Sequence, residues 1–370
     1  MKNKILIVIP TPLAFKQFLA EVSSKLVSSS IEVHVACQYY DEFVYEKDVK
    51  YHFIDIDREV SVFKTIKASR QIRKIVGQIR PNFIHAHFSS SCFLLALSKT
   101  KSFPKCYATI QGALSTSEDL GLKKYIYRFF EIFALKKMDR SFVLTDDDYV
   151  LLKPSVPNLS LQTAKGFGVN LERFQRKIEF DQEAFKGSLG IDKNDFIMIY
   201  IGRLVNFKGF NLTIRIFDRI NEIQPNTKLI VCGVEDKIRG LQLNTEENEI
   251  WQTNKNILKI GFTTELEKYL AIADLNIFPS RREGMPVNLM ESIASEVPCI
   301  TSNYRGCRHV VMHRLNGIVV EEYSVDSFTK EITNLISQPE KLAFLKEGCD
   351  RTRFLYDRDL YFNELLELYY

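Results

Sequence analysis

Short apolar runs alternate with helical patterns along most of the chain, and this alternation limits the possible folds more than any other feature. The runs span four to seven residues, and turns separate them from stretches with helical periodicity. They are residues 5–9, 31–37, 83–88, 106–110, 196–201, 228–232, 257–262, 275–278 and 299–302. Because strands that alternate with helices pair in parallel, the pattern predicts an α/β protein.

Length and charge add a division into two parts. A chain of 370 residues with 45% hydrophobic content predicts two domains of ordinary size. The formal net charge is +4, but residues 1–170 alone carry 24 Lys and Arg against 16 Asp and Glu. The first part is therefore basic and the rest acidic. With a pI near 8.5, this distribution argues against a nucleic-acid partner.

The cysteines and the first apolar run indicate the cellular compartment in which the protein is expected. The seven cysteines are odd in number, scattered and mostly placed in apolar segments, which indicates reduced core thiols in a cytoplasmic protein. The first apolar run has five residues and stops at Pro10, so we expect no signal peptide. No apolar stretch reaches the roughly 20 residues that a membrane span requires.

Residues 275–296 combine a buried strand, a charged turn and a helix that begins at Pro286 and continues through Glu296. The inner face of the helix is expected to consist of Met290, Ile293, Ala294 and Val297. Glu283 and Glu291 are expected to lie about 10 Å apart, given the rise of a helix. That separation suits one long ligand held at two points, with its anionic middle at the helix N-terminus. A nucleotide-sugar has this form, although two isolated glutamates are more often a helix cap and a solvated residue.

A second polar segment, GRLVNFKG at residues 202–209, follows the run 196–201. Gly202 allows the backbone to approach a ligand, and Arg203 and Lys208 place two cations at the carboxyl end of a strand. Taken alone, these cations are equally explained as solvated loop residues. Gly233 follows the run 228–232, and Phe262 ends the run 257–262.

Together these segments resemble the donor site of the family-4 retaining glycosyltransferases of the GT-B fold. The resemblance is carried by EGMPVNLME, with FPS before it and VPCITSNYRGCRHVVMHRLNGIVV after it. It is strong over roughly residues 195–330 and weak over the first 175. It implies two Rossmann-like domains that face each other across a cleft.

The resemblance also implies roles for individual residues. Glu291 would bind the ribose hydroxyls, while Glu283, with Gly284 and Met285, would contact the transferred sugar. Arg203 and Lys208 would neutralise the donor diphosphate, so the catalytic set is Glu283, Arg203 and Lys208, with Glu283 orienting the sugar and not acting as a nucleophile. The expected donor-binding set is Gly202, Gly233, Phe262, Gly284, Met285, Val287 and Glu291. We expect no metal and no other cofactor, since cations and a helix N-terminus can stabilise the leaving diphosphate.

The first part of the chain contains candidates for the acceptor side. His85 and His87 in FIHAHF share one strand face, but no third ligand follows nearby, so a zinc site is not expected. The resemblance makes His87 an acceptor-side candidate. Gln111 stands where many family members have a histidine, and an amide can form hydrogen bonds but cannot carry a proton. A GxGxxG fingerprint is also missing, which argues against a nicotinamide cofactor.

Residues 121–140 are both basic and aromatic. The basic residues are Lys123, Lys124, Arg128, Lys136, Lys137 and Arg140, and the aromatic ones are Tyr125, Tyr127, Phe129, Phe130 and Phe133. This mixture suits a helix on an anionic membrane surface. It equally suits a buried helix whose lysines extend to solvent.

We therefore expect residues 1–172 to bind the acceptor, with a C-terminal helix in residues 352–370 packing back on them, and residues 173–351 to bind the donor. The expected reaction transfers a sugar from a nucleotide-sugar, UDP in preference to GDP, to a hydroxyl of a lipid-linked saccharide, with retention of configuration. The pathway would be synthesis of lipopolysaccharide, capsule or another surface glycan. The protein would be cytoplasmic and peripheral at the inner face of the membrane. A GT-B sugar-nucleotide epimerase and a non-catalytic partner subunit are the alternatives.

Overall fold

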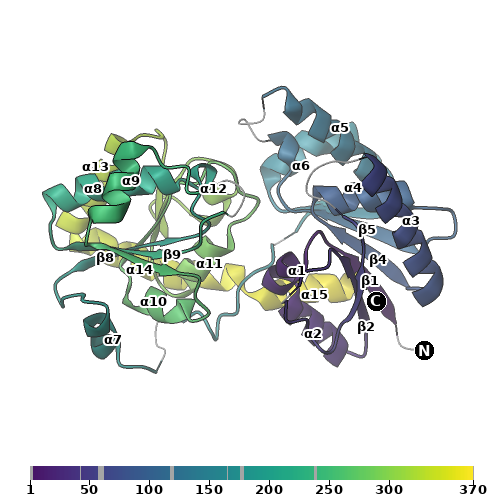
Figure 1. The fold of residues 1–370 in the computed structure, drawn as a ribbon, viewed down its shortest axis with the longest axis horizontal. Helices are drawn as coiled ribbons and strands as arrows, with labels where there is room; N and C mark the ends of the chain where they lie inside the picture. The colour runs from purple at the N-terminus through teal and green to yellow at the C-terminus, as the bar shows by residue number, and fades with distance from the viewer. Residues whose placement is uncertain are drawn as a thin grey trace. The chain divides into compact units, whose positions relative to one another are not determined.

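A computed structural model describes residues 3–41, 43–56, 62–116, 121–164, 166–175, 179–236 and 240–369. The chain forms two compact units, residues 1–167 with 359–370, and residues 168–358. Each unit contains one sheet of parallel strands with helices on both faces (Figure 1). The predicted α/β fold with two Rossmann-like sheets is confirmed. The divisions at 167/168 and 358/359 lie a few residues from the expected 172/173 and 351/352.

The first unit contains a seven-stranded sheet with the order β3-β2-β1-β4-β5-β6-β7, so the order reverses between β1 and β4. Its strands are β1 Lys4–Val8, β2 Glu32–Cys37, β3 Lys50–Phe53, β4 Phe83–His87, β5 Lys105–Ile110, β6 Arg140–Val143 and β7 Leu161–Thr163. Every pairing is parallel. The central strands are buried on both faces, as expected for apolar runs covered by helices.

Helices cover both faces of the first sheet (Figure 1). They are α1 Pro12–Phe18, α2 Ala20–Ser28, α3 Val62–Ile79, α4 Ser89–Ser98, α5 Lys123–Leu135, α6 Asp146–Leu152 and α15 Arg358–Tyr369, with short 3₁₀ turns at Leu114–Thr116 and Lys153–Ser155. Thr11 caps α1 by accepting a hydrogen bond from the Ala14 amide, and Pro12 follows it at the helix start. The last helix is fixed to β4 because Nδ1 of His85 lies 2.6 Å from the Tyr369 hydroxyl.

The second unit contains a six-stranded parallel sheet with the order β10-β9-β8-β11-β12-β13, which reverses between β8 and β11. The strands are β8 Phe196–Ile201, β9 Thr227–Cys232, β10 Ile257–Gly261, β11 Leu275–Phe278, β12 Cys299–Ser302 and β13 Gly317–Val320. The helices are α7 Gln182–Ser188, α8 Phe210–Ile223, α9 Thr245–Thr253, α10 Leu266–Ile272, α11 Val287–Ala294, α12 Cys307–Val310, α13 Val325–Ser337 and α14 Pro339–Thr352, with 3₁₀ turns at Asn206–Lys208 and Arg353–Tyr356.

Helix α11 shows where the sequence pattern succeeds and where it fails. The predicted inner-face residues Met290, Ile293, Ala294 and Val297 are all fully buried. The predicted end at Glu296 is wrong, because the helix stops at Ala294 and Glu296 has a φ of 57°, which a right-handed helix cannot accommodate. Pro286 is the N-terminal cap and Val287 the first helical residue.

All seven cysteines are buried and carry free thiols. Burial raises the pKa of Cys37, Cys106 and Cys232 to about 12, so these thiols are not nucleophiles at neutral pH. Within the described ranges, no helix combines the length and apolar character that crossing a bilayer requires.

Candidate functional site

The candidate site lies in the second unit, at the carboxyl end of the sheet where the strand order reverses between β8 and β11. Doubly wound sheets bind their ligands at this kind of position, because the loops on either side diverge there. The loop after β8 contains residues 202–209, and the loop after β11 contains residues 279–286. Both segments that the sequence singled out therefore meet at one edge of one sheet.

Two glycines allow these loops to pack backbone against backbone. Gly209 has a φ of 77°, and a Cβ atom there would lie 2.1 Å from the carbonyl oxygen of Pro279. A Cβ atom on Gly233 would lie 1.9 Å from the carbonyl oxygen of Gly202. Neither position can hold a side chain unless the backbone moves. The loops after β8, β9 and β11 are consequently in direct contact.

Lys208 and Glu283 form an ion pair at the centre of the site. Nζ of Lys208 lies 2.5 Å from Oε1 of Glu283, and the Ser280 hydroxyl donates to the same oxygen at 2.8 Å. The two side chains are only 19% and 8% exposed. The expected phosphate-binding cation and the expected sugar-orienting carboxylate therefore hold each other in place before any ligand arrives.

Further cations gather around the ring of Phe207. The guanidinium carbon of Arg203 lies 5.4 Å from the ring centroid, that of Arg282 lies 4.9 Å away, and Nζ of Lys208 lies 5.9 Å away. Arg203 also pairs with Asp236 at 3.0 Å and is half exposed. These cations make this edge of the sheet suitable for a diphosphate. The sequence did not point to Arg282, which becomes a candidate only through its place beside the Phe207 ring.

Helix α11 presents its N-terminus to the same edge. Its N-cap residue is Pro286, and no side chain caps the amides of the first turn. The helix is fixed in position by two side-chain bonds, from Asn288 to the carbonyl oxygen of Ile201 at 2.8 Å and from Asn276 to the Ser292 hydroxyl at 2.6 Å. An uncapped and firmly held helix start favours a bound phosphate group.

Glu291 lies on α11, one turn beyond its first residue, and its side chain is partly buried. Burial raises the pKa of its carboxyl group to about 7, and the nearby charge of Glu267 acts in the same direction, while Arg173 lowers it. Among the described residues, none forms a hydrogen bond or ion pair with this carboxylate. Glu291 is therefore an acceptor without a partner, which suits hydroxyl groups of a ligand.

Sequence reasoning did not identify Arg173 and Glu267, which lie close enough to Glu291 to affect its charge. Arg173 donates to Oε2 of Glu267 from both Nε and Nη2, at 3.1 and 2.9 Å, and to the carbonyl oxygen of Thr264 at 2.6 Å. A usable signal was the charged pair Glu172-Arg173 in the otherwise apolar segment GFGVNLERF. The partner is 94 residues away in sequence, so only the folded chain reveals the pair.

The remaining donor-side candidates fall into two groups. Gly284 and Met285 follow Glu283 directly, and the turn at Gly306 supports them, since a Cβ atom there would lie 2.6 Å from the carbonyl oxygen of Gly284. Phe262 is 76% exposed directly after the end of β10. Gly284 and Met285 are therefore next to the ion pair, whereas Phe262 follows Gly261, whose carbonyl oxygen accepts a hydrogen bond from the Gly233 amide at 2.8 Å.

The acceptor-side candidates lie together in the first unit. Nδ1 of His87 is 3.1 Å from Nε2 of Gln111, and the His87 ring stacks on His85 at 4.2 Å. His87 is fully buried, and burial lowers its pKa well below the usual value. The pKa of His85 falls to about 3 for the same reason. Both rings are therefore neutral. His87 is not exposed itself, but it contacts Gln111, which is partly exposed.

His85 and His87 were also considered as possible metal ligands. Within the described part of the chain, no group of three or more His, Cys, Asp and Glu side chains is arranged to hold a metal ion. The hydrogen bonds of His85 go to Thr109 at 2.8 Å and to Tyr369. These contacts assign His85 to the packing of the C-terminal helix.

Two family models match the chain. The model "Glycosyl transferase 4-like" matches residues 4–142, and the model "Glycosyl transferases group 1" matches residues 181–349. The first match covers most of the first unit, and the second covers most of the unit that contains the Lys208–Glu283 pair.

Curated relatives extend over most of the chain. UDP-Gal:alpha-D-GlcNAc-diphosphoundecaprenol alpha-1,3-galactosyltransferase of Escherichia coli is 24% identical over 79% of this chain and 76% of its own length. Putative glycosyltransferase EpsD of Bacillus subtilis is 23% identical over 100% and 97%. A Campylobacter jejuni N,N'-diacetylbacillosaminyl-diphospho-undecaprenol alpha-1,3-N-acetylgalactosaminyltransferase is 22% identical over 83% and 81%.

Solved structures share the fold over nearly the whole chain. Sucrose-phosphate synthase from Thermosynechococcus elongatus superposes with a TM-score of 0.82 at 14% identity, covering 99% of this chain and 98% of the other. WaaG, a glycosyltransferase involved in lipopolysaccharide biosynthesis, gives 0.75 at 14% identity, with 98% and 99% covered. Anabaena HepE in complex with UDP-glucose gives 0.80 at 12% identity, with 99% and 98% covered.

Proposed function

We propose that this chain, a glycosyltransferase of the family-4 type with the GT-B fold, transfers a sugar from a UDP-sugar to a hydroxyl of a lipid-linked saccharide with retention of configuration. It is related to enzymes of bacterial surface polysaccharide synthesis. The observation that carries the proposal is the arrangement around α11. An ion pair between Lys208 and Glu283 lies at one end of the helix, and Glu291, for which the described part of the chain offers no hydrogen-bond partner, lies on the helix itself.

The donor fits this arrangement along its length. Glu291 accepts hydrogen bonds from the ribose hydroxyls, which satisfies a carboxylate that has no hydrogen-bond partner among the described residues. The diphosphate lies at the start of α11, close to Arg203 and Lys208. The transferred sugar then reaches Glu283 and the backbone of Gly284 and Met285. In this placement, the ribose, the diphosphate and the transferred sugar each meet a group of complementary chemistry.

The chemistry requires stabilisation of a departing diphosphate. As the bond between sugar and phosphate breaks, negative charge grows on the phosphate oxygen. The ammonium group of Lys208 has three donor hydrogens, so it can retain Glu283 and also donate to the phosphate. Arg203 and the free amides of α11 add to this stabilisation without moving. Glu283 orients the sugar hydroxyls, and the proposal assigns it no nucleophilic role.

The choice of UDP and of a lipid-linked acceptor follows the relatives. The E. coli relative is named for UDP-Gal and for a diphosphoundecaprenol acceptor, and the C. jejuni relative is named for a diphospho-undecaprenol acceptor. HepE has been crystallised with UDP and with UDP-glucose. These names support UDP over GDP as the nucleotide and a lipid diphosphate saccharide as the acceptor.

Helix α5 supports a peripheral position at an anionic membrane. Its buried residues are Glu131, Ala134 and Leu135. Near its start, large apolar side chains are exposed to solvent, at 83% for Leu122, 59% for Tyr125, 57% for Ile126 and 65% for Phe129. Lys123 and Lys124 lie among them. A helix buried on both sides does not expose such residues, so this pattern favours the membrane interpretation over the buried one.

A product assay tests the proposed reaction. The protein is incubated with a panel of UDP-sugars and a diphosphoundecaprenol-linked N-acetylglucosamine acceptor in detergent, and products are analysed by mass spectrometry and proton NMR. We expect an extended lipid saccharide whose new bond keeps the anomeric configuration of the donor. A changed sugar that remains attached to UDP would instead establish an epimerase. No conversion of any UDP-sugar, with or without acceptor, would favour a non-catalytic subunit.

A further inference from the structure

A buried carboxylate that the donor site does not use lies in the first unit. Glu131, on α5, is only 1% exposed. Its Oε1 accepts hydrogen bonds from the Leu114 amide at 2.7 Å and from the Ser89 hydroxyl at 2.8 Å, and its Oε2 accepts one from the Ser115 hydroxyl at 2.5 Å. Glu131 therefore joins α5 to the start of α4 and to the loop after β5, which lie far from it in the sequence.

This carboxylate is held by hydrogen bonds and not by a cation. Among the described residues, no basic side chain pairs with Glu131. Burial raises the pKa of its carboxyl group above the usual value, and the nearby charge of Asp148 acts in the same direction, while the three hydrogen bonds lower it. Asp148 is buried as well and accepts a hydrogen bond from the Ala113 amide at 3.2 Å. Two buried carboxylates at one loop are costly, which is typical of segments whose conformation serves a site.

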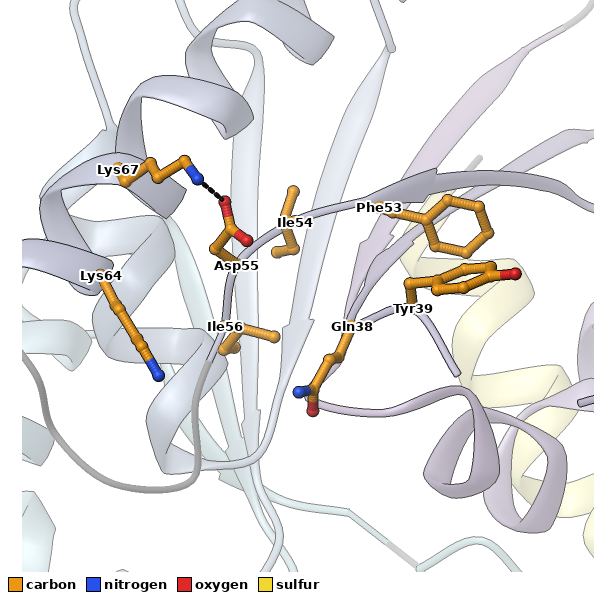
Figure 2. A pocket seen from close by; sticks show the side chains of 8 residues that line it. All are labelled: Gln38, Tyr39, Phe53, Ile54, Asp55, Ile56, Lys64 and Lys67. Atoms are coloured by element: carbon orange, nitrogen blue, oxygen red, sulfur yellow. Dashed lines mark ion pairs between the residues drawn. The ribbon is translucent and has the colours of Figure 1, made fainter. Parts of the chain in front are cut away.

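The segment after β3, at the same carboxyl edge of the sheet, is fixed in another way. It borders a cavity of about 370 Å³, and in Figure 2 Asp55 of this segment reaches Lys67 on α3. Their charged atoms lie 2.9 Å apart, and the side chains of Lys67 and Asp55 are 68% and 44% exposed. An exposed ion pair of this kind adds little to stability and also costs little. The loop after β5 depends instead on a buried charge, so the two loops differ in what holds them.

The elements that Glu131 joins carry the acceptor-side candidates. His87 ends β4 just before Ser89, and Gln111 begins the loop after β5. Nε2 of Gln111 lies 3.1 Å from Nδ1 of His87. Because an amide nitrogen only donates, Nδ1 accepts, and the neutral ring has its proton on Nε2. Within the described part of the chain, that Nε2 atom and Oε1 of Gln111 are buried and have no hydrogen-bond partner. One open donor and one open acceptor suit hydroxyl groups, which both donate and accept.

We propose that Glu131 is a positioning residue for the acceptor, which fixes Gln111 and His87 where they bind hydroxyl groups of the acceptor saccharide. The inference rests on the proposed glycosyl transfer. Glu131 does not touch the substrate itself, and it acts by holding the loop after β5 and the start of α4. The strand order reverses between β1 and β4, so these segments lie at the kind of edge where doubly wound sheets bind ligands. Loss of Glu131 therefore weakens acceptor binding and leaves the donor site of the second unit unchanged.

Steady-state kinetics of four variants of the full chain tests this role. Glu131→Leu removes the acceptor atoms for all three hydrogen bonds. Glu131→Gln keeps one oxygen for two of the donors, and the Ser115 hydroxyl can turn to accept from the new amide. Ser115→Ala removes one hydrogen bond and keeps the carboxylate. Asp139→Leu is the matched control, because the Asp139 carboxylate accepts from the Cys106 amide at 2.8 Å near the opposite end of β5.

The readouts are the KM for a diphosphoundecaprenol-linked acceptor, the KM for the UDP-sugar, and amide hydrogen exchange in residues 111–116. We expect Glu131→Leu to raise the acceptor KM about tenfold, which corresponds to roughly 1.4 kcal/mol, and to leave the donor KM within about twofold. Exchange in residues 111–116 becomes faster in this variant. Ser115→Ala raises the acceptor KM about threefold, whereas Glu131→Gln and Asp139→Leu leave it within about twofold.

Three results would overturn the inference: equal changes in both KM values, unchanged exchange in residues 111–116 of Glu131→Leu, or the same rise of the acceptor KM in Asp139→Leu. If Glu131→Leu does not fold, a wild-type acceptor KM in Ser115→Ala overturns it instead. A wild type that extends no acceptor would refute the proposed glycosyl transfer. The exchange rates then decide separately whether Glu131 fixes the loop.

Discussion

Among single residues, two glutamates of the candidate donor site have opposite environments. Glu283 has its charge balanced by Lys208 and a hydrogen bond from Ser280. Glu291 has no such partner among the described residues, and its pKa is raised to about 7. A residue that costs stability in the free protein and gains partners from a ligand is typical of binding sites.

Replacing Glu291 by Gln is expected to stabilise the free protein at high pH. The pKa of Glu291 is raised from 4.5 to about 7, so between these values the folded chain binds more protons there than the unfolded chain. The free energy of unfolding therefore falls as pH rises through this window. At pH 8, Glu291→Gln should recover at most about 3 kcal/mol, and near pH 4.5 it should change little. Thermal unfolding of the wild type and of Glu291→Gln at the two pH values measures the difference. Equal melting temperatures of the two proteins at pH 8 would show that the ionised Glu291 carboxylate does not destabilise the folded chain.

The Lys208–Glu283 pair predicts strong coupling between two substitutions. Lys208→Met leaves a nearly buried carboxylate without its cation and should cost about 2 kcal/mol or more. Glu283→Gln should be less costly, because an amide still accepts a hydrogen bond from Lys208. The double variant should be more stable than the sum of the single effects predicts, as urea unfolding of all four proteins would measure. Additive effects would mean that the pair contributes no interaction energy, and Lys186→Met, at an exposed ion pair, serves as the control.

At the scale of elements, the site depends on loops that approach each other without side chains. Gly209, the N-cap residue of α8, has a φ of 77° and lies directly against Pro279. Helix α11 is fixed to the ends of β8 and β11 by Asn288 and Asn276. The positions of the charged residues therefore follow from backbone contacts between β8, β11 and the helices that come after them.

Gly209→Ala is expected to destabilise the second unit by more than about 2 kcal/mol and to abolish nucleotide binding, because its Cβ atom would overlap the Pro279 carbonyl oxygen. Gly187→Ala is the control. That glycine lies in α7 with open space around it, so alanine there should be neutral or stabilising by up to about 1 kcal/mol. Calorimetric unfolding and UDP titration give both readouts, and wild-type behaviour of Gly209→Ala would contradict the tight packing of the loops.

The exposed apolar residues of α5 predict binding to anionic vesicles. Phe129→Glu removes a ring that is 65% exposed and adds a negative charge, so affinity for vesicles containing phosphatidylglycerol should fall about tenfold or more. Phe344→Glu is the control, since Phe344 is 50% exposed on α14 of the second unit. Flotation of the two variants with vesicles compares them. Equal loss in both variants, or in neither, would refute the role of α5.

At the scale of the whole molecule, much of the fold follows from apolar runs and helical periods. The nine runs read from the sequence correspond to β1, β2, β4, β5, β8, β9, β10, β11 and β12. Strands β3, β6, β7 and β13 were not predicted. β3 has the sequence KYHF at an edge of its sheet and is only half buried, while β6 and β7 have four and three residues. β3 and β7 are short edge strands of mixed polarity, and β6 begins with Arg140 and Ser141, so no apolar run marks these three. β13 is the apolar sequence GIVV, which the sequence analysis did not single out as a strand.

Those residues of the candidate site that lie close together in sequence could be predicted, whereas their partners from distant parts of the chain could not. Glu283, Gly284 and Glu291 lie within nine residues, and one motif indicates all three. The partners of these residues are distant, because Lys208 is 75 residues from Glu283 and Arg173 reaches Glu267 across 94. His87 packs near the ring of Phe167, and no local sequence pattern predicts a contact between residues so far apart in the chain. A local motif therefore identifies candidate residues, but their distant charged partners become visible only in the folded chain.

If the edge of the second sheet between β8 and β11 is the donor site, UDP stabilises the folded protein through Glu291. Thermal unfolding of the wild type and of Glu291→Ala is recorded with UDP and with GDP. UDP at 100 times its dissociation constant should add about 2.7 kcal/mol to the stability of the wild type, GDP should add less, and Glu291→Ala should lose most of the effect of UDP. A wild type that neither nucleotide stabilises at millimolar concentration, or an equal shift in Glu291→Ala, would contradict the assignment of this edge of the second sheet as the donor site.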